Sequence, residues 1–298
     1  MKKSWPLIFC FLTLFTTTLM AQEYTIGILA KRGTNGFYNR WLMHSAYLEK
    51  ATGQTFVVKP LKFVDIAPAV ASGTIDFLLT NPSIYVDMKI KHHIKALVTM
   101  VNHTEYGAKV SQFGAVIFTH ASNSNINTLS DVKDKTFIAV KKTSLGGYQM
   151  AVKAFKDKGI ELTTTVAKLQ FANTHDEVVK AVFNQPASIG TVRSNILESM
   201  ALTGAIKMKN IKILNQKNNT NFPYLISTAL YPEWPLAVLT KTDPQIAQQV
   251  QEALIQMKTS DLPAELAGIA GWQKALDYNE LETMLRSIGV LASTNTAQ

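Results

Sequence analysis

The stretch TFIAVKKTSLGGYQMAVKAFKDK, residues 136–158, joins a short β-prone run, a polar loop and an amphipathic segment. This order predicts a strand, a turn and a helix. A helix N-terminus exposes unpaired N–H groups, and the loop Lys141 to Gly147 adds hydroxyls, two lysines and two glycines. We therefore expect this loop either to bind an anion or to be an ordinary helix cap, because it matches neither the P-loop nor the dinucleotide fingerprint.

The same alternation of strands and helices recurs along the chain. Strands are predicted over 24–30, 55–61, 75–80, 94–101, 113–119, 136–140, 167–172, 188–192, 209–214 and 225–230. Helices are predicted over 37–50, 65–72, 174–183, 194–201, 243–257, 263–270 and 276–288. Such alternation is typical of an α/β fold with parallel strands.

One helix start lies directly after a predicted strand. Asn81 can cap this helix and Pro82 suits its first position, which places Tyr85 one turn into the helix. Open α/β sheets bind ligands at the carboxyl ends of their strands. Tyr85 is therefore predicted either to face a ligand or to pack on the sheet. Arg193, at another strand-to-helix junction, is predicted either to face a ligand or to be a surface arginine.

Two polar stretches divide the chain into expected lobes. Residues 102–112 and 215–221 are predicted to cross between the lobes. Lobe 1 is then expected to contain residues 22–108 and 222–291, and lobe 2 residues 109–221. The small polar tail, 292–298, is predicted to be disordered.

The first 21 residues have the pattern of a cleavable signal peptide. Lys2 and Lys3 precede an apolar run, and cleavage is expected after Ala21; an uncleaved anchor is the alternative. Removal takes away the only cysteine, Cys10, and lowers the net charge from +9 to +7. The remaining lysines are scattered, which favours attraction of small anions over nucleic-acid binding. No later apolar run reaches the roughly 18 residues that a membrane span needs. We therefore expect a soluble, monomeric periplasmic protein.

Motifs of common catalytic and metal sites are absent from the sequence. It contains no HExxH, GxSxG or Walker motif and no paired cysteines, and the adjacent His92 and His93 would point apart on a helix. The chain is therefore predicted to be a binding protein rather than an enzyme, with neither metal nor cofactor.

Several longer motifs resemble a known family. The runs GTIDFLLTNPSIYVD (73–87), KKTSLGGY (141–148) and SIGTVRSNILE (188–198) resemble the phosphate/phosphonate type of periplasmic solute-binding protein. The runs LYPEWPLAVL (230–239) and AGIAGWQKALDY (267–278) are similar to the periplasmic sensing regions of tetrathionate-type sensor histidine kinases. This resemblance implies a two-lobed type II fold with the ligand cleft between the lobes.

The resemblance also implies a set of ligand-binding residues and a function. By position, the resemblance implies ligand contact at Tyr85, Thr143 and Ser144. We add Arg32 and Arg193 as expected charge partners, and Asn81, Gly146 and Tyr148 as further expected ligand-binding residues. Ser188 stands where many members carry an acid for ligand amines, which favours a purely anionic phosphorus or sulfur oxyanion. The expected partner is a separate membrane-embedded permease of an ABC transporter. The alternatives are a stand-alone sensor subunit for a separate histidine kinase and, less favoured, a periplasmic enzyme.

Overall fold

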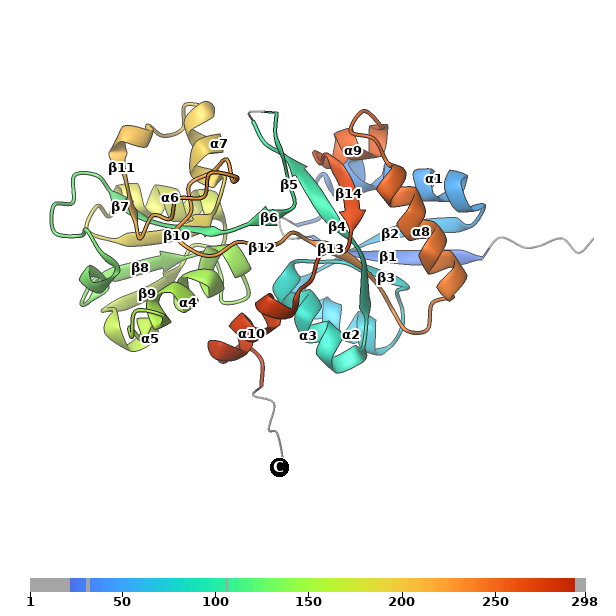
Figure 1. Cartoon of the computed structure of the whole chain (residues 1–298), viewed down its shortest axis with the longest axis horizontal. Helices are drawn as coiled ribbons and strands as arrows, with labels where there is room; N and C mark the ends of the chain where they lie inside the picture. The colour runs from blue at the N-terminus through green and yellow to red at the C-terminus, as the bar shows by residue number, and fades with distance from the viewer. Residues whose placement is uncertain (1–21, 31–32, 106, 293–298) are drawn as a thin grey trace, which may run out of the picture.

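The computed structural model describes residues 22–30, 33–105 and 107–292. The predicted signal peptide, Arg32 and residues 293–298 lie outside the described residues. The described chain forms two α/β lobes that lie side by side and are joined by crossing segments (Figure 1). Among the described residues, no helix combines the length and apolar character required to cross a membrane.

The first lobe is built on a seven-stranded sheet. Its main strand order is β14-β4-β13-β3-β1-β2, and β5 pairs with β4. The strands are β1 (Glu23–Leu29), β2 (Thr55–Leu61), β3 (Phe77–Leu79), β4 (Lys95–His103), β5 (Lys109–Val110), β13 (Pro235–Val238) and β14 (Gly271–Lys274). Strand β1 is parallel to β2 and β3, whereas β13 runs antiparallel between β3 and β4.

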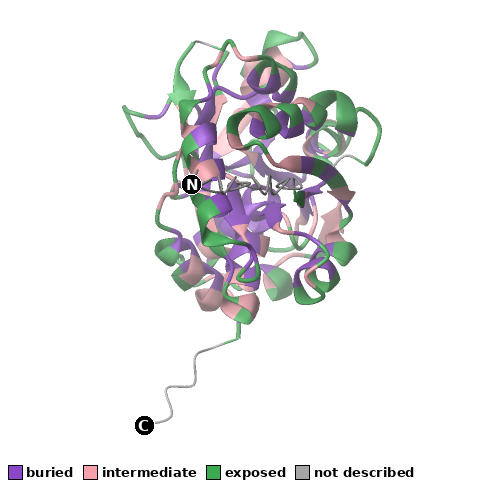
Figure 2. Cartoon of the chain, turned by 90° about the vertical axis from the view of Figure 1, so that its right-hand side faces the viewer, coloured by how far each residue is buried: buried purple, intermediate pink, exposed green. Residues whose placement is uncertain are grey.

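Helices cover both faces of this sheet (Figures 1 and 2). One face is packed by α1 (Phe37–Thr52), α8 (Pro244–Gln256) and α9 (Leu262–Ala267). The other face is packed by α2 (Ile66–Ala71), α3 (Pro82–His92) and α10 (Asn279–Ser287). A sheet covered on both faces needs apolar residues on both sides of its strands, which explains the continuous apolar run in β3.

The second lobe contains a five-stranded sheet with the order β11-β7-β10-β8-β9. Its strands are β7 (Ala115–His120), β8 (Thr136–Ala139), β9 (Lys168–Phe171), β10 (Ile189–Arg193) and β11 (Ile211–Leu214). Its helices are α4 (Met150–Lys156) and α5 (Leu162–Thr165) on one face, and α6 (His175–Asn184) and α7 (Ile196–Leu202) on the other. Strands β8, β9 and β10 are parallel, so their carboxyl ends meet at one edge.

A small two-stranded sheet lies where the chain crosses between the lobes. Strand β6 (Gln112–Phe113) pairs antiparallel with β12 (Tyr231–Pro232). The expected crossing over 102–112 is only partly right, because β4 continues to His103 and β5 still belongs to the first sheet. The sheets change between β5 and β7 and again between β11 and β13, while the lobe limits given above remain a prediction.

The predicted strand over 225–230 is wrong. This segment lies along β7, but side chains form much of its pairing: Ser227 Oγ accepts from Ile117 N at 2.9 Å, and Thr228 Oγ1 accepts from Ala115 N at 2.9 Å. Ser227 Oγ also donates to Leu214 O at 2.7 Å. Hydroxyls thus replace main-chain ladder bonds at the edge of β7, which strand propensity does not reveal.

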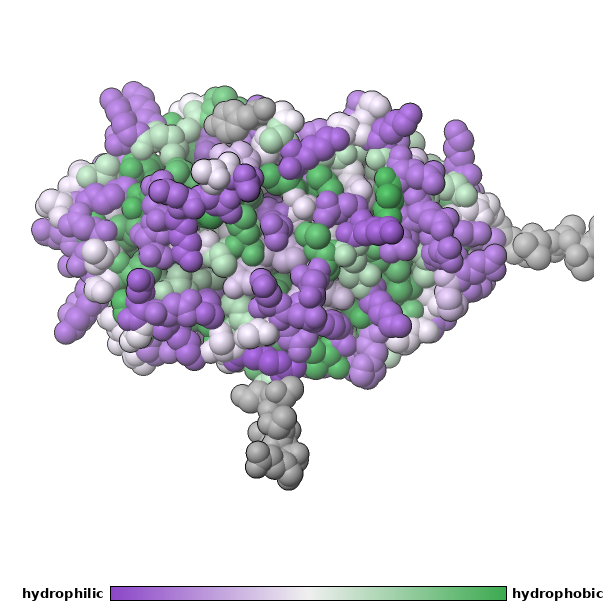
Figure 3. Space-filling view, viewed as in Figure 1, coloured by the Kyte–Doolittle hydropathy of each residue, from purple (hydrophilic) through white to green (hydrophobic). Residues whose placement is uncertain are grey.

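Polar side chains cover most of the molecular face shown in Figure 3, and apolar side chains emerge only in small areas between them. The two apolar cores of each lobe lie beneath this surface.

Candidate functional site

The polar loop predicted from the sequence lies at the carboxyl edge of the second sheet. Lys142 and Thr143 are exposed, and Ser144 caps the following turn by accepting a hydrogen bond from Gly147 N at 3.2 Å. The helix begins with a π-helical turn, Leu145–Gln149, before α4. Such turns are rare in proteins, and those that occur are often found at functional sites. The strand, loop and helix start are thus present, with hydroxyls and lysines beside the first N–H groups.

Gly146 permits this loop to lie directly against the end of β10. A Cβ atom at this position would lie 3.0 Å from Phe113 Cε2 and 3.1 Å from Arg193 Cβ. These separations are too short for an unstrained side chain, so glycine allows the close approach. Ser144, Gly146 and Arg193, three of the predicted ligand-binding residues, are thereby brought together.

Arg193 forms a bidentate ion pair with Glu233. Arg193 Nη1 lies 3.2 Å from Glu233 Oε2, and Nη2 donates to Oε1. The Glu233 side chain has 0% exposure, whereas that of Arg193 keeps 17%. The guanidinium carbon lies 4.3 Å from the centre of the Phe113 ring, a cation–π contact. The arginine that was predicted as a charge partner of the ligand is therefore already paired with a carboxylate.

Glu233 is fixed by contacts to its backbone from both sides of the crossing segment. Its N–H donates to Ser111 O at 2.8 Å, and the Tyr278 hydroxyl donates to Glu233 O at 2.8 Å. The Tyr278 hydroxyl also lies 2.8 Å from Thr99 Oγ1 on β4. The ion pair therefore links β10 of the second lobe to β4 of the first through Glu233 and Tyr278.

In the first lobe, α3 starts as the sequence predicts. Asn81 Oδ1 accepts a hydrogen bond from Ile84 N at 3.0 Å, and Pro82 is the first helical residue, as predicted. Across the boundary between the lobes, Lys141 Nζ lies 5.3 Å from the centre of the Phe63 ring. Leu145 of the second lobe also belongs to an apolar cluster of the first. The lobes are thus in contact beside the polar loop.

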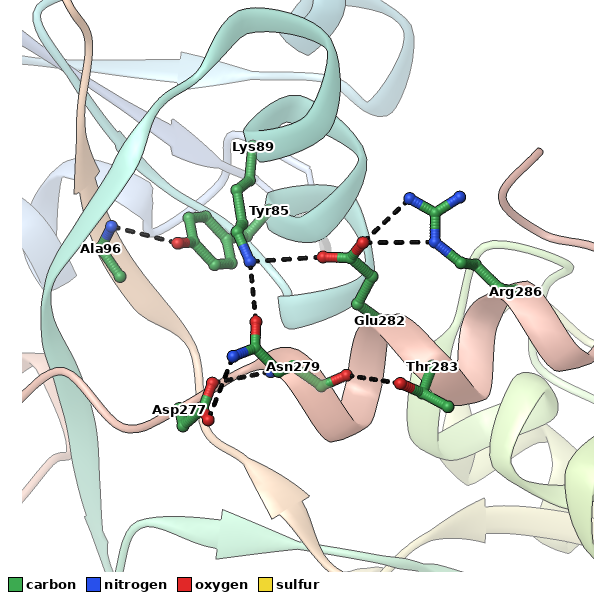
Figure 4. Close-up of polar contacts among 8 residues, drawn as sticks. All are labelled: Tyr85, Lys89, Ala96, Asp277, Asn279, Glu282, Thr283 and Arg286. Atoms are coloured by element: carbon green, nitrogen blue, oxygen red, sulfur yellow. Dashed lines mark hydrogen bonds and ion pairs between the residues drawn. The ribbon is translucent and has the colours of Figure 1, made fainter. Parts of the chain in front are cut away.

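Tyr85 points into the first lobe. Its side chain is 4% exposed, and its hydroxyl accepts a hydrogen bond from Ala96 N at 3.2 Å (Figure 4). The Tyr85 and Tyr278 rings are 4.9 Å apart and meet edge to face. Burial raises the pKa of the Tyr85 hydroxyl above its ordinary value. These contacts give Tyr85 a packing role, and its contact with a ligand remains a prediction.

We expect Tyr85→Phe to lower the free energy of unfolding by about 1 to 3 kcal/mol, because the Ala96 N–H loses its partner. Urea denaturation of the unliganded protein measures this change. If the substitution instead weakens ligand binding and leaves unfolding unchanged, the hydroxyl serves the ligand rather than the fold. Tyr38→Phe is a matched control, since Tyr38 lies on the surface of α1.

The side chains of Tyr148 and Ser188 are both buried in the second lobe. Tyr148 packs in the second lobe, 9% exposed, with its ring 5.4 Å from that of Phe171. Ser188 directly precedes β10, is buried, and donates to Gln185 O at 2.6 Å. Strand β10 separates it from Arg193 by roughly 16 Å of extended chain. The inference from Ser188 that the ligand is purely anionic remains a prediction.

Sequence reasoning missed two polar residues beside Arg193. Glu233 is the first, and its signal was a lone acid within the apolar run LYPEWPLAVL. His175 is the second: its Nδ1 accepts a hydrogen bond from Arg193 N at 3.2 Å. Its signal was its position at the start of α6, directly after the capping residue Thr174. The described residues contain no cluster of three His, Cys, Asp or Glu side chains suited to a metal ion.

A separate charged network joins α3 to α10 (Figure 4). Glu282 pairs with Arg286 at 2.9 Å and with Lys89 at 3.3 Å. The hydrogen bond from Arg286, followed by that from Lys89, holds the pKa of the Glu282 carboxyl below its ordinary value. Lys156 of the second lobe donates to Ser287 O at 2.5 Å, so α10 contacts both lobes.

Solved structures with this architecture are two-lobed periplasmic binding proteins. PhnD1 of Prochlorococcus marinus, in complex with methylphosphonate, has a TM-score of 0.68 at 12% identity over 91% of this chain and 99% of its own. A phosphonate-transporter binding component of Pseudomonas aeruginosa has a TM-score of 0.66 at 14% identity over 93% and 90%. These likenesses confirm the two-lobed α/β fold.

A curated relative and a family model extend the comparison to sequence. The tetrathionate sensor histidine kinase TtrS of Salmonella typhimurium is 28% identical over 270 residues, which are 90% of this chain and 44% of the kinase. The chain thus spans less than half of that relative. Both resemblances seen in the sequence are confirmed. Residues 26–279 match the model described as "ABC transporter, phosphonate, periplasmic substrate-binding protein", and the chain belongs to this family of periplasmic binding proteins.

Proposed function

We propose that this protein binds a small phosphorus or sulfur oxyanion between its lobes and presents it to the permease of an ABC transporter. The observation that carries the proposal is the loop Lys141 to Ser144 at the start of a π-helical turn, in contact with the first lobe through Lys141 and Phe63. Helix-start N–H groups, hydroxyls and lysines are the groups that bind oxyanions in proteins.

Movement of the lobes would connect binding to transport. A ligand that contacts both lobes stabilises the arrangement in which they lie together, and the population shifts toward that arrangement. The permease would then distinguish the loaded from the empty protein by the surface that this arrangement presents. We propose binding rather than turnover, and recovery of the ligand unchanged after incubation with the protein tests this point.

A second candidate is a sensor subunit that signals to a separate histidine kinase. The 28% identity to the tetrathionate sensor kinase favours it, and the similar C-terminal runs contain Glu233 and Tyr278. Co-purification with a permease would support transport, whereas co-purification with a kinase would support sensing. In either case, the ligand site is the same.

Thermal unfolding of residues 22–298 tests the ligand class. The panel is phosphate, phosphite, methylphosphonate, sulfate, thiosulfate and tetrathionate. A ligand at 100 times its dissociation constant adds about 2.7 kcal/mol of stability. At about 2 to 4 °C per kcal/mol, this raises the Tm by several degrees. A flat response to every compound would contradict the proposal.

Thr143→Ala is expected to weaken binding of the oxyanion identified in this way by about tenfold or more, because a hydroxyl bonded to an anion contributes about 1.5 to 3 kcal/mol. Isothermal titration calorimetry measures the change. Ser144→Ala is a less clean test, since loss of the cap also costs about 1 kcal/mol of stability. Thr163→Ala, an exposed threonine beyond the far end of α4, is the control and should bind normally. Equal affinities for Thr143→Ala and the control would remove Thr143 from the site.

A further inference from the structure

Glu233 forms an ion pair with Arg193, the arginine that lies beside the proposed ligand loop. We infer that Glu233 competes with the ligand anion for Arg193, and that this competition determines which anions the cleft accepts and how tightly. The inference rests on the proposed function, since it concerns the same cleft. It assigns the specificity-determining role to a residue of the crossing segment rather than to the loop itself.

The two partners differ in their access to solvent. The Glu233 side chain is fully buried, whereas Arg193 keeps 17% of its side chain exposed. Arg193 also contacts the ligand loop, because its Cα and Cβ lie within 3.3 Å of the position that a Cβ atom on Gly146 would take. The guanidinium carbon lies 4.3 Å from the centre of the Phe113 ring, and Cε2 of this ring would lie 3.0 Å from the same Cβ atom, so the guanidinium and the loop share Phe113 as a neighbour. An anion can approach the exposed part of Arg193, whereas Glu233 is closed to solvent.

The guanidinium of Arg193 can bind either the Glu233 carboxylate or an oxyanion through the same pair of N–H donors. It donates in parallel through Nη1 and Nη2 to the two oxygens of Glu233. Sulfate, phosphate and phosphonate groups offer a similar pair of oxygens, and arginine binds them with the same forked geometry. An oxyanion can therefore use the same two donors, but displacing the carboxylate leaves the buried Glu233 charge without its partner, and this cost makes Glu233 an effective competitor.

The backbone of Glu233 is held by two hydrogen bonds. Ser111 O and the Tyr278 hydroxyl fix the Glu233 backbone at 2.8 Å each, so the carboxylate cannot move away with a loop. A ligand can bind Arg193 only in the fraction of molecules in which Arg193 is not paired with Glu233. The apparent dissociation constant of the ligand rises accordingly. Weakly charged anions are excluded first, because they gain least from Arg193.

The test removes the negative charge of Glu233 and keeps its shape. We expect Glu233→Gln to bind at least one of sulfate, phosphate, methylphosphonate and tetrathionate about tenfold more tightly than the unmodified chain, a change of about 1.4 kcal/mol. The reason is that the uncompensated guanidinium gains a partner when the anion binds. Calorimetric titration at pH 7 and low ionic strength measures all four affinities.

The double variant Arg193→Gln/Glu233→Gln is the matched control. It leaves no unpaired charge, and the gain must disappear in it if the gain acts through Arg193. Glu233→Asp provides a variant that keeps the buried charge should Glu233→Gln fail to fold. Its shorter side chain competes less well for both Nη atoms, so a smaller gain in anion affinity is expected.

The outcomes separate this inference from the proposed function. Binding by the unmodified chain with no gain in Glu233→Gln or Glu233→Asp would overturn the inference and leave the proposed function standing. No binding by the unmodified chain, with a gain in Glu233→Gln that the double variant lacks, would support the inference and contradict the proposed oxyanion function. A gain that persists in the double variant, a loss of affinity, or no binding by any variant would overturn the inference.

Discussion

Arg193→Ala is expected to lower the free energy of unfolding by about 3 to 5 kcal/mol, because it leaves the buried Glu233 carboxylate without its partner. Breaking one side of a buried pair costs far more than the pair contributes, since the remaining charge cannot be solvated. Urea unfolding at pH 7, followed by tryptophan fluorescence and circular dichroism, measures the loss.

The control is Lys91→Ala on α3. Lys91 pairs with Asp87 at 2.8 Å, but the two side chains are 59% and 32% exposed, so water replaces the missing partner. Its loss of stability should be much the smaller of the two. A loss in Arg193→Ala no larger than that of the control would show that water reaches Glu233 and that the pair is not isolated from solvent.

The second large effect is a loss of stability in acid through His44. Its side chain is 4% exposed, and neither ring nitrogen has a hydrogen-bond partner among the residues that the structure describes. The rings of Trp41 and Trp272 lie 5.0 and 6.1 Å away, centre to centre. Burial lowers the pKa of His44 to about 4. The unfolded chain, with a histidine pKa of about 6.5, therefore binds more protons than the folded chain between these two values.

Stability consequently falls as the pH is lowered from about 6.5 to about 4, by roughly 3 kcal/mol in total. Above pH 6.5 the group is neutral in both states and contributes no pH dependence. Urea unfolding at pH 7, 6, 5 and 4 measures the slope. His44→Leu removes the titrating group, so its curve should be flatter than that of the unmodified chain by this amount. Parallel curves would show that His44 is protonated without cost.

Elements with local signals were predicted well from the sequence. Asn81 and Pro82 start α3 as expected, Thr174 caps α6, and Gly53, with a φ of 72°, ends α1. Each signal depends on backbone groups within four residues, so the sequence contains the whole interaction. Strands β13 and β14 were not predicted. They are short, and their pairing with β4 joins residues more than 100 positions apart.

The candidate site likewise has a local part that the sequence predicts and a long-range part that it does not. The loop from Lys141 to Gly147 and the close approach that its glycines permit could be predicted, because strand, loop and helix follow one another in the chain. The pairing of Arg193 with Glu233 could not, since it joins two lobe elements 40 residues apart. Nor could the buried orientation of Tyr85, which depends on Ala96 and Tyr278. Local motifs indicate where a ligand could bind, whereas long-range contacts decide which side chains are available to it.

The position of β13 has a consequence for how the chain folds. Strand β13, residues 235–238, lies between β3 and β4, so these two early strands have no shared edge until the last quarter of the chain is present. All strands of the second sheet, in contrast, come from residues 115–214. Non-local strand pairing is slow, and unpaired edges promote aggregation. The five strands of the second sheet can therefore pair early, whereas the central edges of the first sheet stay unpaired until the C-terminal residues are present.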